Sequence, residues 1–268
     1  MMEKKAIIER NRQYWDAIAD EYQDEIDICV NDFHYGPLVP GDSEMKLLPG
    51  DVKGLRCYEF GCGAAQNSLY LASLGADCIA SDISLEQLQE ANRIAESLNL
   101  RVETLHMEMG ELLPEDYGKF DLIHSSYALA FSPDPAKVIA HCARMLKPGG
   151  TLLFSTGHPL FSGEWLMIDD DEGLFLKDYF QPQPDIRYNQ MGEEVARAVY
   201  YPIGQMADWV IAAGLRIERI VEPAPVKLDT RDLEEMMSKV PYFSESWSEY
   251  YDQLQHYPVV VIFKCCLS

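Results

Sequence analysis

Strand-like and helix-like segments alternate between residues 55 and 156, and this alternation limits what the chain can fold into more than any other feature. Strands are predicted at residues 56–60, 77–81, 102–106, 120–125 and 151–156, with helices at 66–74, from 84 onward and at 135–146. Strands that alternate with helices pair in parallel, because each crossover returns the chain to the same end of the sheet, and the helices then cover both faces. The sequence therefore predicts an α/β fold with a doubly wound, mostly parallel sheet.

The alternation ends on both sides of this core, residues 55–156, and the flanking segments differ from it. Residues 1–54 contain an amphipathic helix, predicted at 7–26, followed by a loop with several prolines and glycines. Residues 157–203 are rich in aromatic residues, proline and acids and are too long for a plain connection, so they are predicted to form an insert. Residues 204–268 hold a further helix and two further strands and are predicted to complete the same core.

The turn after the first strand carries the clearest ligand-binding pattern. Gly61 and Gly63 follow the strand directly and precede a helix. Glycine lets the backbone turn sharply and lets a ligand lie against it, while the N–H groups that begin the helix point at that ligand. Asp82 ends the second strand about twenty residues later, where a carboxylate accepts hydrogen bonds from ribose hydroxyls. This arrangement predicts a cofactor that contains a nucleoside.

Three features bear on which cofactor binds. The dinucleotide-binding pattern has a third glycine where this chain has Gln66. Glu59, two residues before the first glycine, is poorly placed for a pyrophosphate and suits a cationic ligand. The chain after residue 156 does not continue as a second mononucleotide-binding half. These features disfavour a nicotinamide-dependent oxidoreductase, which remains the alternative hypothesis.

The same residues resemble a known family. The segment Glu59-Phe60-Gly61-Cys62-Gly63 resembles motif I of the class I, Rossmann-like S-adenosylmethionine-dependent methyltransferases, and Asp82 resembles their ribose-binding acid. The segment Leu146-Lys147-Pro148-Gly149-Gly150 resembles the turn before their fifth strand. The chain is similar to the small-molecule methyltransferases of ubiquinone and menaquinone biosynthesis. It departs from them at Ala65, where the family often has a third glycine.

The resemblance implies a fold, a cofactor and a set of contacts. It implies seven strands, with the last strand antiparallel and inserted near the edge, and an N-terminal lid formed by residues 1–54. It implies S-adenosyl-L-methionine as cofactor, with Glu108 and Met109 near the adenine, Ser125 and Tyr127 facing the methionine part and Tyr22 near the cofactor carboxylate. For Glu108 a solvated acid, and for Tyr22 a core residue, is the alternative. The full set of expected cofactor-binding residues is Tyr22, Glu59, Gly61, Cys62, Gly63, Asp82, Ile83, Glu108, Met109 and Ser125.

The expected reaction is in-line transfer of a methyl group to a small-molecule acceptor. Two residues are catalytic candidates: Tyr127, and His158 at the carboxyl edge of the fifth strand as a general base, with a structural His-Pro turn as the alternative for His158. The insert, as a substrate cap, holds aromatic residues that either wall an acceptor pocket or form their own small core: Trp165, Tyr179, Phe180, Tyr188, Tyr200 and Tyr201. A non-catalytic S-adenosylmethionine-binding module is a further alternative, and the patterns do not indicate which atom is methylated.

Charge and composition limit the partners. The chain has 44 acidic and 22 basic residues and a formal net charge of −22, which repels polyanions and argues against a nucleic-acid substrate. Apolar runs fall well short of the roughly 20 residues needed to span a bilayer. Seven cysteines without a CxxC pair indicate neither a disulfide framework nor a zinc site, so no metal is expected. The expected protein is cytoplasmic, without a membrane partner, and a monomer or homodimer.

Overall fold

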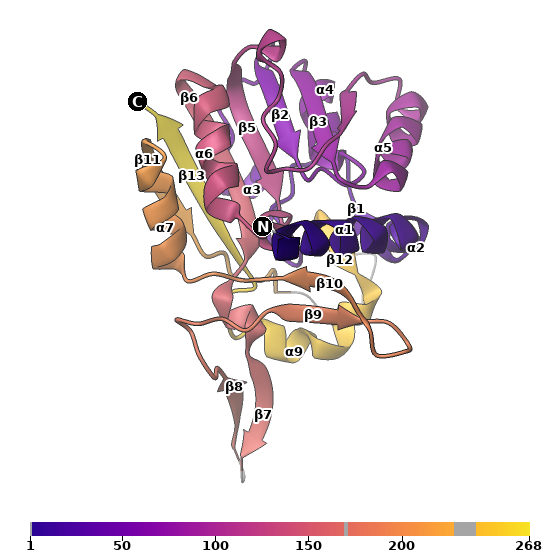
Figure 1. Cartoon of the computed structure of the whole chain (residues 1–268), viewed down its shortest axis with the longest axis vertical. Helices are drawn as coiled ribbons and strands as arrows, with labels where there is room; N and C mark the ends of the chain where they lie inside the picture. Colours follow the sequence, from indigo (N-terminus) through magenta and orange to yellow (C-terminus); the bar gives the residue numbers. More distant parts are fainter. Residues whose placement is uncertain (1, 169–170, 228–239) are drawn as a thin grey trace.

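A seven-stranded sheet forms the centre of the computed structural model, which describes residues 2–168, 171–227 and 240–268 (Figure 1). Its strand order is β11-β13-β6-β5-β2-β3-β4. The strands are β2 (Arg56–Phe60), β3 (Asp77–Asp82), β4 (Glu103–His106), β5 (Phe120–Ser126), β6 (Leu146–Gly157), β11 (Leu215–Val221) and β13 (Val260–Leu267).

The direction of the strands confirms the predicted topology. Strands β2 to β6 pair in parallel. Strand β13, the last of the chain, inserts antiparallel between β6 and β11. The fold is thus the expected doubly wound, mostly parallel seven-stranded sheet with an antiparallel last strand.

Apolar side chains pack on both faces of the sheet beneath helices α4 (Gln66–Ser73), α5 (Leu85–Ser97), α6 (Pro135–Met145) and α7 (Ile203–Ala212). Successive residues of β5 point to opposite faces, so Leu122 lies in one buried cluster and Ile123 in another. Val138 of α6 packs with Ile123, and Leu71 of α4 packs in the cluster of Leu122. Helices therefore cover both faces, as the sequence predicts.

The N-terminal segment forms two helices where the sequence predicts one at 7–26. They are α1 (Met2–Ala17) and α2 (Ala19–Glu25), separated at Ile18, whose φ of −107° and ψ of 5° lie outside helical geometry. Figure 1 shows both helices crossing the edge of the sheet at which the parallel strands end. A short strand, β1 (Ile26–Ile28), follows and pairs antiparallel with β12 (Tyr242–Ser244). The N-terminal segment is thereby joined to residues close to the C-terminus.

The insert after β6 contains regular structure that hydrophobic periodicity did not indicate. Strands β7 (Glu164–Ile168) and β8 (Asp171–Phe175) pair as one antiparallel ribbon, and β9 (Asp185–Tyr188) and β10 (Glu194–Ala198) as a second. In Figure 1 the β7–β8 ribbon projects away from the body, whereas β9 and β10 lie beside α1. Two short helices, α3 (Asp42–Met45) and α9 (Tyr251–Leu254), complete the described α-helices. None of the helices in the described residues is long and apolar enough to cross a membrane.

Candidate functional site

A cavity of about 640 Å³ lies at the carboxyl ends of the parallel strands and brings most of the predicted site residues together. Ligands bind at this edge in open α/β sheets. The predicted residues that line it are Tyr22, Gly61, Cys62, Gly63, Asp82, Ile83, Glu108, Met109 and Tyr127. Within the described part of the chain, Glu59, Ser125 and His158 are not among its lining residues.

The glycine turn forms the floor of the cavity and needs its glycines. Gly61 and Gly63 have φ values of 60° and 54°, which L side chains rarely adopt. A Cβ on Gly61 would lie 2.5 Å from the Cβ of Ala128, the residue that follows Tyr127 after β5. Ala65, the departure from the family pattern, adopts the left-handed conformation that glycine would favour, with φ of 57°. The turn is therefore preserved with alanine at the third position.

Asp82 is held in place between the turn and the start of α5. Its Oδ2 accepts a hydrogen bond from the Gly63 amide at 2.8 Å, and its Oδ1 accepts one from the Ser84 amide at 2.9 Å. Burial raises the pKa of Asp82 above its ordinary value. Each carboxylate oxygen has a second lone-pair site, so Asp82 retains acceptor capacity for hydroxyl groups in the cavity.

Glu59 lies behind the glycine turn and is 2% exposed. Its Oε2 accepts hydrogen bonds from the amide of Ser68 at 3.1 Å and from its hydroxyl at 2.5 Å. Its Oε1 faces Nδ1 of His124 at 3.8 Å. Burial raises the pKa of Glu59 to about 8. The side chain thus ties α4 to β2, behind the position where the sequence places the cofactor.

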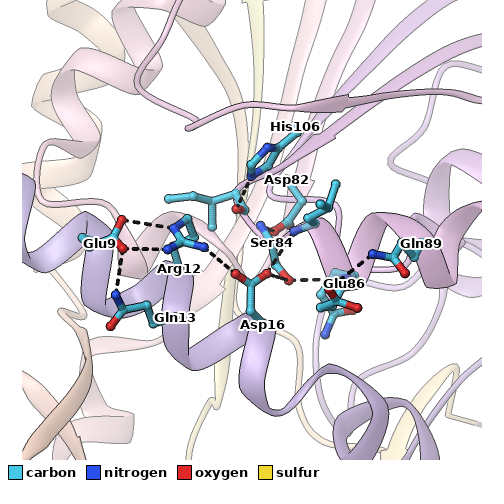
Figure 2. Close-up of polar contacts among 12 residues, drawn as sticks. Glu9, Arg12, Gln13, Asp16, Asp82, Ser84, Glu86, Gln89 and His106 are labelled. Atoms are coloured by element: carbon cyan, nitrogen blue, oxygen red, sulfur yellow. Dashed lines mark hydrogen bonds and ion pairs between the residues drawn. The ribbon is translucent and has the colours of Figure 1, made fainter.

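Asp16 of α1 joins the N-terminal helix to the start of α5, next to Asp82 (Figure 2). Its Oδ1 accepts hydrogen bonds from the Ser84 hydroxyl at 2.9 Å and the Leu85 amide at 3.0 Å. Its Oδ2 accepts a hydrogen bond from Arg12 at 2.6 Å. The carboxylate therefore satisfies an N–H group at the beginning of α5 that has no partner within the helix.

Gln23 of α2 makes a second attachment between the N-terminal segment and the core. Its amide nitrogen donates to Gln87 of α5 at 2.9 Å, and its amide oxygen accepts from Gln66 of α4 at 2.9 Å. All three side chains line the cavity. Helix α1 is thus hydrogen-bonded to α5, and α2 is hydrogen-bonded to both α4 and α5. Helix α4 begins beside the glycine turn and α5 begins beside Asp82.

Aromatic side chains line the rest of the cavity. Trp15 of α1 packs edge-on against Tyr22 and Phe131, with ring centroids 5.3 and 5.2 Å away. The hydroxyl groups of Tyr22 and Tyr242 are hydrogen-bonded to each other. The aromatic residues of this region, here called the aromatic chamber, are Trp15, Tyr22, Phe131, Trp165, Tyr200, Tyr242, Trp247, Tyr250 and Tyr257.

The aromatic residues of the insert differ in where they lie, and only some of them line the cavity. Trp165 and Tyr200 line the cavity. Tyr201 instead packs on Trp209 of α7, with centroids 4.9 Å apart. Phe180 and Tyr188 are exposed.

His34 lines the cavity and was not identified from the sequence. It is 7% exposed, and its Nδ1 has no hydrogen-bond partner among the described residues. Burial lowers its pKa to about 3, so the ring is neutral near pH 7. Its amide donates to the Asn67 side chain at 2.9 Å, and its carbonyl accepts from Asn67 and Ser126 at 3.0 and 2.8 Å. The loop that holds His34 has no hydrophobic period, so only the residue type itself was a signal.

Both ring nitrogens of His158 have protein partners. Nδ1 accepts a hydrogen bond from the Leu160 amide at 3.1 Å, so Nε2 carries the hydrogen and donates to Glu222 at 2.7 Å. Burial lowers the pKa of His158, while Glu222 opposes that shift. Both nitrogens are thus hydrogen-bonded to protein groups, and His158 is not among the described residues that line the cavity. The role of general base remains a prediction for this residue.

The cavity walls are acidic overall. The charged residues among its described lining are Asp82, Glu108, Asp185 and Arg187, three carboxyl groups and a single guanidinium. Burial raises the pKa of Glu108 as it does that of Asp82. A cationic ligand would relieve the cost of burying these carboxylates, because an opposite charge stabilises their ionised form.

Comparison with known proteins identifies the core. Residues 58–154 match the family model described as methyltransferase domain. The chain is 33% identical over 109 residues to a ubiquinone biosynthesis O-methyltransferase of Bordetella avium. The aligned segment covers 41% of this chain and 45% of that protein. It is 35% identical over 105 residues to the protein of the same name from Methylococcus capsulatus. Here the aligned segment covers 39% of this chain and 44% of that protein. The matches thus span less than half the length of these curated relatives.

A solved structure matches most of the chain. The S-adenosylmethionine-dependent methyltransferase of Mesorhizobium loti superposes with a TM-score of 0.64 at 23% sequence identity, covering 83% of this chain and 94% of that protein. The similarity in fold therefore extends beyond the segment matched in sequence. Residues 58–154 match the methyltransferase-domain family, and the chain shares its Rossmann-like α/β fold with this solved S-adenosylmethionine-dependent methyltransferase.

Proposed function

We propose that this chain is an enzyme that transfers the methyl group of S-adenosylmethionine to a small-molecule acceptor. The observation that carries the proposal is that a single cavity joins the glycine turn and Asp82 to the aromatic chamber. Direct transfer requires donor and acceptor to lie in line within one enclosed space. A nucleoside site open to an apolar chamber meets that requirement.

The cofactor half of the cavity fits S-adenosylmethionine. Asp82 would accept hydrogen bonds from the ribose hydroxyls, Glu108 and Met109 would flank the adenine, and Tyr22 and Tyr127 would contact the methionine part. The turn from Gly61 to Gly63 leaves room for the ligand against the backbone. When bound, the cofactor supplies a methyl group on a positively charged sulfur, already activated for displacement. The acidic side chains that line the cavity favour a positively charged ligand there.

The residues of the chain then act mainly by orientation and by excluding water. Helices α1 and α2 enclose the cavity, and the aromatic rings give an acceptor flat walls to lie against. An acceptor that loses a proton needs a base or hydrogen-bond acceptor nearby. His34 is neutral, lines the cavity and has a buried Nδ1 without a partner among the described residues, so it is a second candidate; His158 remains the candidate from sequence.

We also propose the nature of the partners. The net charge of −22 and the enclosed cavity favour a metabolite over tRNA or DNA. Residues 157–203 act as the substrate cap, since β9 and Tyr200 line the acceptor side. The seven free cysteines fit a reducing compartment, which supports a cytoplasmic protein, either monomeric or homodimeric.

Two measurements test this function. Calorimetry with S-adenosylhomocysteine and with NADH should show binding of the first only; binding of NADH alone would favour the oxidoreductase. Tritium from methyl-labelled S-adenosylmethionine should then enter at least one member of a panel of small hydroxy, amino and thiol metabolites. Label that enters bulk tRNA instead would overturn the small-molecule acceptor. Cofactor binding without transfer to any panel member would favour the non-catalytic module.

A further inference from the structure

Arg187 of β9 is an ordered cation in the acceptor side of the cavity. Its guanidinium lies over the rings of Tyr14, Trp15 and Phe131, at 5.1, 5.5 and 5.4 Å from their centroids. One terminal nitrogen donates to the Tyr14 hydroxyl at 2.7 Å. These contacts fix the plane of the group and engage one of its five N–H donors.

No described carboxylate lies within ion-pair distance, 4.0 Å, of Arg187. Asp185, on the same strand, acts on it electrostatically from farther away. By contrast, Arg197 on the neighbouring strand pairs with Glu194 at 2.8 Å. In a chain with twice as many acidic as basic residues, a half-buried guanidinium without a close carboxylate is a place for an anion supplied by a ligand.

Four tyrosines line the same cavity as this guanidinium. The charge of Arg187 acts on Tyr22, Tyr127, Tyr200 and Tyr242, and burial raises the pKa of all four, so they remain protonated near neutral pH. The Tyr22 and Tyr242 hydroxyls are bonded to each other, which uses the hydrogen of one and leaves the hydrogen of the other for a further acceptor. The Tyr200 hydroxyl already donates to Asp185 at 3.5 Å, so the pair of Tyr22 and Tyr242 supplies the neutral O–H donor beside the cation.

We propose that Arg187, with the Tyr242 hydroxyl, binds a carboxylate of the methyl acceptor, so that the acceptor is a small monocarboxylic acid with an aromatic or otherwise apolar body. This inference rests on the function proposed above. The guanidinium and the Tyr242 hydroxyl bind the carboxylate, and the rings of the aromatic chamber contact the body. Arg187 belongs to the insert and not to the glycine turn, which assigns it to the acceptor rather than to the carboxylate of the cofactor.

The test uses matched acid and amide probes with the full-length protein saturated with S-adenosylhomocysteine. The pairs are benzoate and benzamide, 2-naphthoate and 2-naphthamide, and indole-3-acetate and indole-3-acetamide, measured by calorimetry. The wild type should bind at least one acid 10-fold or more tightly over its amide, since charge-assisted hydrogen bonds are lost in the amide. Arg187→Gln should abolish that preference with S-adenosylhomocysteine affinity within about threefold. Arg187→Lys should keep part of the preference because it keeps the charge.

The control variant is Arg197→Gln, which removes an arginine of the same insert outside the cavity lining and should leave the preference intact. Circular dichroism and melting curves establish that each variant is folded. A wild type that prefers no acid to its amide would overturn the inference and leave the methyltransferase proposal standing. A loss of S-adenosylhomocysteine affinity in Arg187→Gln would assign the residue to the cofactor carboxylate and would also overturn it. A wild type that does not bind S-adenosylhomocysteine would overturn the proposed function, and this inference with it.

Discussion

The carboxylate of Asp16, on the N-terminal helix, accepts a hydrogen bond from the hydroxyl of Ser84 at 2.9 Å. Ser84 is also the N-cap of α5, where its hydroxyl oxygen accepts from the Gln87 amide at 3.2 Å. The bond therefore joins α1 to the helix that begins three residues after Asp82. The position of α1 and that of the proposed ribose-binding acid are structurally linked through Ser84.

Removing this link should loosen cofactor binding without unfolding the core. Asp16→Ala removes the acceptor for the Ser84 hydroxyl and the Leu85 amide, so we expect S-adenosylhomocysteine to bind about 10-fold more weakly, mainly through faster dissociation. Calorimetry and stopped-flow measurements give the affinity and the rate. Glu9→Ala is the matched control, because Glu9 also binds Arg12 but on the exposed side of α1. Equal affinities in all three proteins would argue against a latched lid.

Asp82→Ala should weaken S-adenosylhomocysteine binding by about 1–3 kcal/mol, the value of lost charge-assisted hydrogen bonds. Asp121→Ala is its control. Asp121 accepts from the Arg56 amide and pairs with Lys147 at the opposite end of the sheet, so its removal should leave cofactor affinity unchanged. A similar loss in both variants would indicate a general effect on the fold and would remove Asp82 from the site.

Glu59 should make the stability of the protein fall as pH rises. Its folded pKa of about 8 exceeds the ordinary 4.5, so between these values the folded state holds a proton that the unfolded state releases. The stabilisation is complete below pH 4.5 and is lost as pH rises towards 8, at about 1.4 kcal/mol per pH unit. Glu59→Gln does not titrate, so the unfolding free energy of the wild type relative to this variant should drop between pH 5 and 7.5 in urea titrations. The buried histidines titrate in both proteins and largely cancel. Parallel pH curves would contradict the raised pKa.

Two histidines can be compared as proton acceptors once the tritium assay supplies a labelled acceptor. His34→Gln should lower turnover by roughly 100-fold with S-adenosylhomocysteine affinity unchanged, if its free Nδ1 receives the acceptor proton. His158→Ala loses two buried hydrogen bonds, so we expect a lower melting temperature and turnover within a few-fold of wild type. A 100-fold loss of turnover in folded His158→Ala would instead support the assignment made from sequence.

The sequence predicted the core closely because strands and turns there follow local rules. The bounds of β2 agree with the prediction to the residue, and Gly61, Gly63 and Asp82 meet at the cavity. Such features depend on alternation of apolar residues, on glycine at positive φ and on short connections, all of which can be seen within a few residues of chain.

The remainder depends on contacts between distant segments. His34 is fixed by Asn67 and Ser126, and Arg187 by Tyr14, partners that lie 33 to 173 residues away. The apolar residues at 7–26 recur at the spacing of one continuous helix, which gave no sign of the break at Ile18. Local patterns carry no information on such pairings, which is why the acceptor side was harder to predict than the cofactor side.

The pairing of β1 with β12 and the position of β9 beside α1 have an evolutionary consequence. The residues of the aromatic chamber all lie outside residues 58–154, apart from Phe131 after β5. They can therefore diverge, or be exchanged between homologues, while the donor-binding core stays constant. A chimaera that keeps this core and receives the three flanking segments together, because they bond to one another, would be a direct route to altered substrate selection.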